Sequence, residues 1–292
     1  MSSPFSALPI ELILSVVLVA ADHQPTALSL SLVSSWVHRH VEPALYHAVR
    51  LRSARSLTSF ISTLDDKPHG FAHRTVKRLC ITALGPISNI QAVLSKCTGV
   101  TSLASGFSVP SYVHCVRGQP STLEEQKSTM FRCLPIAPKE QHLLSLACRD
   151  GLDMAIISPT VSRLRIQLTP AVTSETIAQL AELSLLTHLA LVYNQGLFDT
   201  IKDMLQPLIH GGRLRVLVLQ VAGGAADGHL EEIQKWSQVQ GEMRSSRNDV
   251  VEGKSLDLTV SAIRAPRTFL SEWEASDAFW QHAEDGIVSV VV

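Results

Sequence analysis

Apolar side chains in the first fifty residues recur at helical spacing. Over Ile10–Ala21 they fall three and four residues apart, which places them on one helical face, and Pro9 suits the first turn. The polar segment Asp22–Pro25 interrupts this pattern. A third helix is predicted to begin near Pro43, because apolar positions spaced by four residues continue to Val49. These patterns predict a small helical module at the start of the chain.

The stretch between these two helices fits two periods. Leu28, Leu30 and Leu32 alternate as in a strand, whereas a helical face that includes Leu28 and Leu32 continues to Val37. Because the strand alternation stops at Val33 and Thr26 can cap a helix, we expect a helix here.

Beyond the module, a different spacing recurs: apolar, two residues, apolar, one residue, apolar. The copies are Val76/Leu79/Ile81, Val161/Leu164/Ile166, Leu186/Leu189/Leu191, Leu214/Leu217/Leu219 and, more faintly, Leu256/Leu258/Val260, with an incomplete unit around Leu103. The central leucines Leu164, Leu189 and Leu217 lie 25 and 28 residues apart. These spacings are within the roughly 20 to 29 residues of a leucine-rich repeat, whose signature the third copy completes at Asn194.

Helical patterns separate the predicted strands. They cover Pro86–Cys97, Thr173–Ser184, Leu197–Ile209 and Asp227–Ser237, and a further helix is expected over Phe269–His282 before an apolar strand at Ile287–Val292. Alternating strands and helices predict an α/β fold with parallel strands, stacked as an irregular solenoid of leucine-rich-repeat type. A doubly wound α/β domain is the alternative, and the period of about 25 residues favours the solenoid.

Composition and charge restrict the possible partners. Hydrophobic residues make up 46% of the 292 residues, which favours a folded chain with a sizeable core. The formal net charge of −1 and the absence of a long Lys/Arg run argue against nucleic acid. No stretch is long and apolar enough to predict a membrane span.

The cysteines and the N-terminus indicate the compartment. The five cysteines include no CxxC pair, so we expect neither a disulfide framework nor a zinc site, and a reducing compartment, cytoplasmic or nuclear, fits best. Met1–Leu8 carries no Lys or Arg and Glu11 falls within the apolar run, which argues against a signal peptide.

No constellation of catalytic residues stands out, and neither a cofactor nor an enzymatic activity is expected. The phosphate-loop and nucleophile-elbow patterns are absent. Cys148 could be drawn as a nucleophile, but Leu143, Leu146 and Cys148 follow the repeat spacing, which predicts a small core residue in a strand.

Two further sets of residues were considered as binding sites. The histidine pairs His38/His40 and His69/His73 lack additional ligands at metal-binding spacing, so no metal is expected. Trp273 and Trp280, seven residues apart, are expected to pack on one helical face.

The N-terminal residues resemble an F-box. The matching pieces are Leu8-Pro9-Ile10-Glu11-Leu12, the break at Asp22–Pro25, Leu32-Val33-Ser34-Ser35-Trp36, and Pro43 with Tyr46. Trp36 follows Val33 one residue sooner than in the commonest pattern, and Val37-His38 stands where a basic residue is frequent. With the degenerate repeats behind it, the architecture is similar to that of fungal F-box proteins.

The resemblance implies two domains and two partners. Residues 1–52 would form the F-box-like module, and residues 53–292 a recognition domain with irregular inserts at about 106–138 and 238–254. The module would bind a Skp-family adaptor, and through it the cullin of a ubiquitin ligase, using Leu8, Pro9, Leu12, Leu32, Val33 and Trp36.

The repeats would present a concave face to an unknown protein target. Its residues would be those between the repeat leucines, among them Arg163, Arg165, His188, Ala190, Arg215 and Val218. Two alternatives stay open: a repeat scaffold outside any ligase, in which the first helices are only a structural cap, and a hydrolase that uses Cys148 or a serine with a distant histidine.

Overall fold

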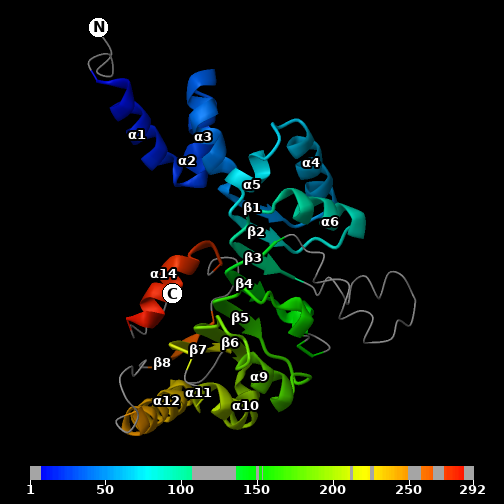
Figure 1. Cartoon of the computed structure of the whole chain (residues 1–292). Helices are drawn as coiled ribbons and strands as arrows, with labels where there is room; N and C mark the ends of the chain where they lie inside the picture. The colour runs from blue at the N-terminus through cyan, green and yellow to red at the C-terminus, as the bar shows by residue number, and fades with distance from the viewer. Residues whose placement is uncertain are drawn as a thin grey trace. The chain divides into compact units, whose positions relative to one another are not determined.

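The computed structural model describes most of the chain (Figure 1). The described residues are 8–106, 136–148, 151–152, 154–210, 213–223, 227–248, 258–265 and 273–285. Contacts divide the chain into two compact units, Met1–Thr101 and Ser102–Val292. The division therefore falls at residue 101, whereas the sequence analysis places the end of the helical module at residue 52.

Three helices open the first unit: α1 (Ile10–Ala21), α2 (Gln24–Ser31) and α3 (Ser35–His47). The prediction for α1 is confirmed. The helix expected to run on to Val37 is instead divided, because Ser34 caps a new helix by accepting a hydrogen bond from the Val37 backbone N–H at 3.2 Å. Helix α2 begins after His23, so Thr26 lies inside it and the predicted cap is wrong.

The prediction of a separate helix beginning at Pro43 is also wrong. Pro43 lies inside α3, which continues to His47. Proline removes one backbone hydrogen bond from a helix interior, and the exposed position of Pro43 lets water solvate the carbonyl group left without its donor. Val49, expected in this helix, lies in the strand β1 (Ala48–Leu51).

The remainder of the first unit is a parallel strand pair with three helices. Strand β1 pairs with β2 (Arg78–Ile81), so that Val49 lies opposite Leu79. Between the strands lie α4 (Ala54–Asp65) and α5 (Phe71–Thr75), and α6 (Ile87–Lys96) follows β2 and packs beside α4 (Figure 1). The prediction of β2 and α6 is confirmed, whereas the sequence analysis missed β1, α4 and α5.

Six parallel strands form the sheet of the second unit: β3 (Ser102–Ser105), β4 (Glu140–Leu143), β5 (Arg163–Gln167), β6 (His188–Asn194), β7 (Val216–Ala222) and β8 (Thr259–Arg264). Leu164, Leu189 and Leu217 lie directly opposite one another on neighbouring strands. The strands follow one another in chain order, unlike a doubly wound sheet, in which the order reverses. The structure thus confirms an α/β class with parallel strands.

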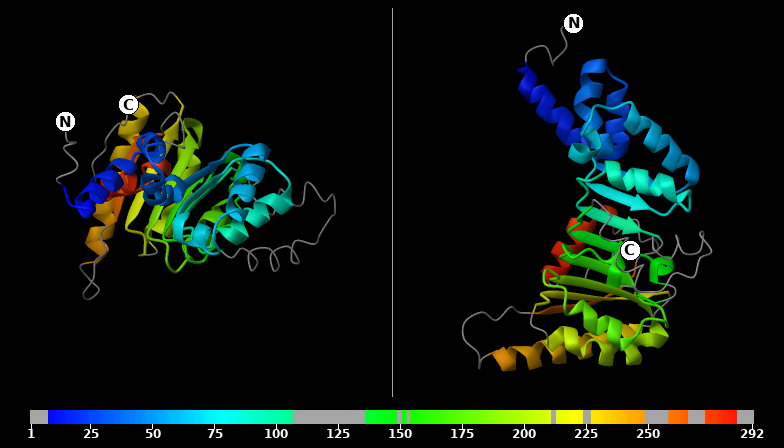
Figure 2. Two further views of the ribbon diagram at one scale, coloured as in Figure 1. Left: turned by 90° about the horizontal axis from the view of Figure 1, so that it is seen from above. Right: turned by 45° about the vertical axis from the view of Figure 1, so that its right-hand side comes forward.

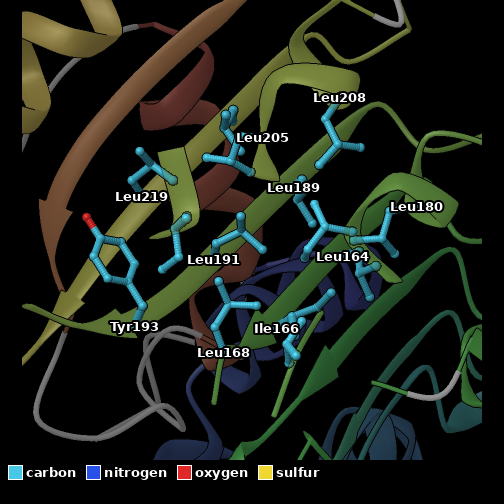
Figure 3. Close-up of a cluster of buried hydrophobic side chains, with 14 of the residues drawn as sticks. Leu164, Ile166, Leu168, Leu180, Leu189, Leu191, Tyr193, Leu205, Leu208 and Leu219 are labelled. Carbon is cyan, nitrogen blue, oxygen red and sulfur yellow. The ribbon is translucent and has the colours of Figure 1, made fainter. Parts of the chain in front are cut away.

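The main core of this unit lies on one face of the sheet. Side chains at alternate strand positions point to the same face, so Leu189, Leu191 and Tyr193 all face the helices. These helices include α9 (Ser174–Leu180), α10 (Phe198–Met204) and α11 (Gln206–His210). Figure 3 shows the strand leucines interleaved with side chains of these helices. Each fully buried leucine contributes about 1.5 to 3 kcal/mol, so this cluster is a principal source of stability.

One short helix covers part of the opposite face. Helix α14 (Ser276–Glu284) packs on β7 and β8, and in Figures 1 and 2 it lies on the other side of the strands from α9 and α10. Its Trp280 and Ala283 form a second cluster with Ala190, Val216 and Val218. The sheet therefore has a helix on each face in the region of β6 and β7.

Several predicted elements differ from the structure at their ends. Helix α12 (Asp227–Asn248) extends eleven residues beyond the predicted end at Ser237, which shortens the insert expected from residue 238. The strand expected through Leu146 and Cys148 ends at Leu143, and Cys148 lies in the 3-10 helix η3 (Ser145–Cys148). Most of the insert expected at 106–138, the first part of the helix expected at 269–282, and the strand expected at 287–292 lie outside the described residues.

Candidate functional site

Exposed apolar side chains are concentrated on α1, α2 and the turn that follows. Of twelve large hydrophobic side chains exposed in the described residues, nine lie between residues 8 and 33. These nine, here called the N-terminal apolar surface, are Leu8, Ile10, Leu12, Val16, Leu18, Val19, Leu28, Leu32 and Val33. Leu32 is the most exposed, at 86%. Because soluble proteins seldom expose so many apolar residues in one region, this surface is a candidate binding site.

Helix α1 has two apolar sides. One side carries Val17 and Ala21, which pack into the core of the module. The other carries Leu12, Val16 and Val19, which are four and three residues apart and therefore form one stripe on the helix. A helix that is apolar all round is ordinarily buried all round, so the outer stripe is what a partner protein would be expected to cover.

The core of the module is built from small side chains. Its buried members are Ala21, Ala27, Val37 and Val41, while the leucines of α1 and α2 lie around it or outside it. Alanine and valine let the three helices approach closely, but they bury little apolar area per residue. Leu30, Trp36 and Leu45 pack partly against this core, whereas Leu12, Leu18, Leu28 and Leu32 remain exposed.

Five of the six residues predicted to face an adaptor are exposed: Leu8, Pro9, Leu12, Leu32 and Val33. Trp36 differs, because it is half-buried, packs against the module core and lies 4.6 Å from the His40 ring between centroids. The His40 Nδ1 atom lies 2.8 Å from the Trp36 carbonyl oxygen, to which it can donate. Trp36 is therefore positioned to support the module at least as much as to contact a partner.

Five exposed residues of this surface were not among the predicted adaptor contacts. They are Ile10, Val16, Leu18, Val19 and Leu28. The signal for the four on α1 was present in the sequence, since the run from Ile10 to Ala21 contains more apolar residues than a single helical face can hold.

The residues predicted to bind a target lie at and around the sheet face that carries α14. Arg163, Arg165 and His188 alternate with the buried leucines of β5 and β6, which places them on the face opposite the main core. Arg165 is buried and donates from Nε to the Gln220 Oε1 atom of β7 at 3.0 Å. Arg215 precedes β7 and is exposed.

Helix α14 contacts two of these residues through its acidic side chains. Arg163 Nη1 donates to Asp277 Oδ1 at 3.0 Å, and His188 Nε2 lies 2.6 Å from Glu284 Oε1. The His188 ring also contacts the Trp280 ring edge to face, with centroids 5.6 Å apart. The predicted open concave face is therefore occupied along β5 to β7 by a helix of the same chain.

The two tryptophans near the C-terminus anchor this segment. Both are fully buried, and Trp273 donates from Nε1 to the Ser102 hydroxyl of β3 at 3.1 Å. The expectation that Trp273 and Trp280 serve in packing is confirmed by this burial, but they do not share one helical face, because α14 begins at Ser276, after Trp273. They hold the C-terminal segment on the sheet at two separate points.

Electrostatics keep His188 neutral near pH 7. Burial lowers the pKa of His188 from its usual value, the hydrogen bond to Glu284 opposes this shift, and the positive charges of Arg163 and Arg215 add to it. The Thr187 hydroxyl lies 2.8 Å from Nδ1 and 3.2 Å from the Ser162 carbonyl oxygen, so it can donate to either acceptor, while Nε2 donates to the Glu284 carboxylate. The contact with Glu284 is thus a hydrogen bond from a neutral ring.

The thiol considered as a nucleophile is in a poor environment for that chemistry. Cys148 is fully buried, and burial raises the pKa of its thiol to about 12. The reactive thiolate is therefore scarce at neutral pH. Cys148 serves as a small core residue, as expected, although in a 3-10 helix and not in a strand.

Neither a metal site, a membrane-spanning helix nor a related protein was found for the part of the chain that the structure describes or for its sequence. Among the described residues, no group of three or more His, Cys, Asp or Glu side chains could hold a metal ion. No helix in the described part of the chain has the length and apolar character needed to cross a membrane. A scan against protein-family models and a search of curated proteins found no match to this chain.

Proposed function

We propose that this chain is the substrate-recognition subunit of a Skp-cullin-F-box ubiquitin ligase. In this proposal, the N-terminal apolar surface binds a Skp-family adaptor and, through it, a cullin. The strand and helix units of the second unit, stacked as a leucine-rich-repeat-like solenoid, bind the protein target. The observation that supports it best is the concentration of nine of twelve exposed large hydrophobic side chains between residues 8 and 33.

The spacing of the exposed residues fits a helical partner. Leu12, Val16 and Val19 form one stripe along α1, and Leu28 and Leu32 are four residues apart at the end of α2. Stripes of this kind fill grooves between helices of a partner protein. The F-box resemblance, which includes Leu12 and Leu32, supports a Skp-family adaptor as that partner.

The alternative of a structural cap predicts a different pattern of burial. A cap would bury Pro9, Trp36 and their neighbours against the first strand and helix units, whereas Leu8, Pro9 and Leu12 are exposed and Trp36 is half-buried. The burial pattern therefore favours the adaptor proposal over the scaffold outside a ligase.

Co-purification of the full chain with a Skp-family adaptor tests the proposal. Replacing both Leu12 and Leu32 by Asp places charges on the N-terminal apolar surface, and we expect it to abolish co-purification. Leu185→Asp is the matched control, because Leu185 is an exposed leucine of the second unit, and it should leave binding unchanged. Failure of the wild-type chain to bind, or full binding by the double variant, would refute the proposal.

A further inference from the structure

Helix α14 makes a set of contacts with the sheet that resembles the docking of a peptide helix. Asp277, Trp280 and Glu284 are three and four residues apart, and therefore lie on one side of the helix. Trp280 contacts an apolar floor, and the two carboxylates meet Arg163 and His188 on either side of it. Anchors at i, i+3 and i+7 are typical of helices that bind in grooves.

The floor beneath Trp280 belongs to the predicted target-binding face. Its residues Ala190, Val216 and Val218 come from β6 and β7. The sequence alone had predicted two of these floor residues, Ala190 and Val218, on the target-binding face. It had also predicted Arg163 and His188, the partners of the two carboxylates, on the same face. The helix thus shows which chemistry this face accepts: an apolar aromatic anchor between two carboxylates.

The fit of α14 to this face is imperfect. The Trp280 Nε1 atom is buried, yet it has no hydrogen-bond partner among the residues that the structure describes. A buried donor without an acceptor loses its hydration and gains nothing in return. A competing helix with an anchor that lacks this donor, such as phenylalanine or leucine, would avoid that penalty.

The other contacts of α14 also permit its release. The side chains of Asp277 and Glu284 are 90% and 40% exposed, so water screens both acidic contacts. The helix has nine residues, too few to be stable alone in water, so it would lose its structure on leaving the sheet.

We propose that α14 is an internal ligand of the target-binding face, and that the target presents an acidic amphipathic helix that replaces it. The target helix carries a carboxylate, an apolar anchor three residues later and a second carboxylate four residues after that. The identity of this face as the target site depends on the proposed function, whereas the exchange of one helix for another on it does not.

A labelled synthetic peptide of residues 273–285 tests the exchange in the full chain. Fluorescence anisotropy should show it binding at least tenfold more tightly to the Trp280→Ala chain, whose own helix has lost its anchor, than to the wild type. The matched control is Gln281→Ala, an exposed position on the same helix, which should behave as the wild type. Adding Val218→Asp to the Trp280→Ala chain should abolish peptide binding.

Hydrogen exchange of the unmodified chain provides a second test that does not depend on any substitution. The amides of Phe279–Asp285 should exchange at least 30-fold faster than those of Leu189–Tyr193, because α14 opens while the sheet stays folded. Equal protection of both segments, or equal peptide affinity in the Trp280→Ala and wild-type chains, would overturn the inference. Neither experiment uses the adaptor, so their failure is distinct from a failure of the proposed function.

Discussion

Leu32 and Leu12 provide a quantitative test of the proposed adaptor contact. Each lies on the N-terminal apolar surface, and Leu32 is almost fully exposed in the free chain. Replacement of a leucine by alanine removes three carbon atoms that the adaptor would otherwise bury. At about 0.8 kcal/mol per buried methylene group, each substitution should cost about 2 kcal/mol of binding free energy. This cost corresponds to an increase in Kd of about 30-fold for each variant.

The same substitutions should hardly change the stability of the free chain. Surface substitutions away from special features usually change the free energy of unfolding by less than about 0.5 kcal/mol. The thermal midpoints of Leu12→Ala and Leu32→Ala should therefore stay close to that of the wild type. A loss of affinity without a loss of stability separates a contact residue from a core residue such as Val41, which is fully buried within α3.

Isothermal titration calorimetry with a purified Skp-family adaptor is the appropriate assay. It should also show a negative heat-capacity change, because binding would bury apolar area. The measured Kd should change little between low and high salt, since the surface consists of uncharged side chains. The reasoning fails if both alanine variants bind within threefold of the wild type, or if Leu185→Ala in the second unit weakens binding as much as they do.

Three further predictions concern the interior of the protein. First, the buried thiols of Cys97 and Cys148, whose pKa values burial raises to about 12, should resist alkylation at pH 8 until urea unfolds the chain; rapid labelling of either thiol in the native protein, read by peptide mass spectrometry, would contradict this. Second, burial lowers the pKa of His188 in the folded chain, so the unfolded chain binds a proton first as the pH falls. The stability that the neutral His188 ring contributes is therefore complete above the unfolded pKa of about 6.5 and is lost as the pH falls below it. The urea midpoint of the wild type should thus fall more between pH 7.5 and 5.5 than that of His188→Asn, and equal falls would refute the assignment. Third, Gly99→Ala should destabilise the first unit by about 1 to 3 kcal/mol, because a Cβ there would lie 1.8 Å from the His73 carbonyl oxygen and force the backbone apart. Gly196→Ala is its control, since a Cβ there meets nothing within 4 Å, and similar thermal midpoints for the two variants would contradict the prediction.

The repeat spacing was sufficient to predict the parallel strands at β5, β6 and β7. Leu164, Leu189 and Leu217 lie opposite one another because each is the second residue of a parallel strand and is buried in the same core. A burial pattern with a fixed period is a local property that a sequence displays directly. For the same reason the start of α9 was predictable from Thr173, which caps it by accepting a hydrogen bond from the Thr176 backbone N–H at 3.3 Å.

The features that sequence reasoning missed depend on competition between local signals or on distant contacts. Pro43 suggested a helix start, but Ser34 had already capped α3 nine residues earlier. Arg163 and His188 were predicted to share one sheet face, and nothing near them in the sequence indicates that Asp277 and Glu284 contact them. Those contacts join residues about a hundred positions apart, and only the folded chain brings them together.

The contrast between α1 and α14 connects the two proposals. Helix α14 buries Trp280 on its own sheet, whereas α1, which has two apolar sides, leaves the stripe Leu12, Val16 and Val19 exposed in the free chain. Exposed apolar stripes such as that of α1 favour aggregation. The chain covers the apolar residues of β6 and β7 with its own helix α14, but it leaves the α1 stripe uncovered. The cost of leaving the α1 stripe bare is removed when a partner is bound to it. In the proposal for α14, by contrast, the sheet face is covered by the chain's own helix until a target helix that binds more tightly replaces it. In the two proposals, the exposed stripe of α1 is the adaptor contact, and the face beneath α14 becomes accessible only when a target helix replaces α14.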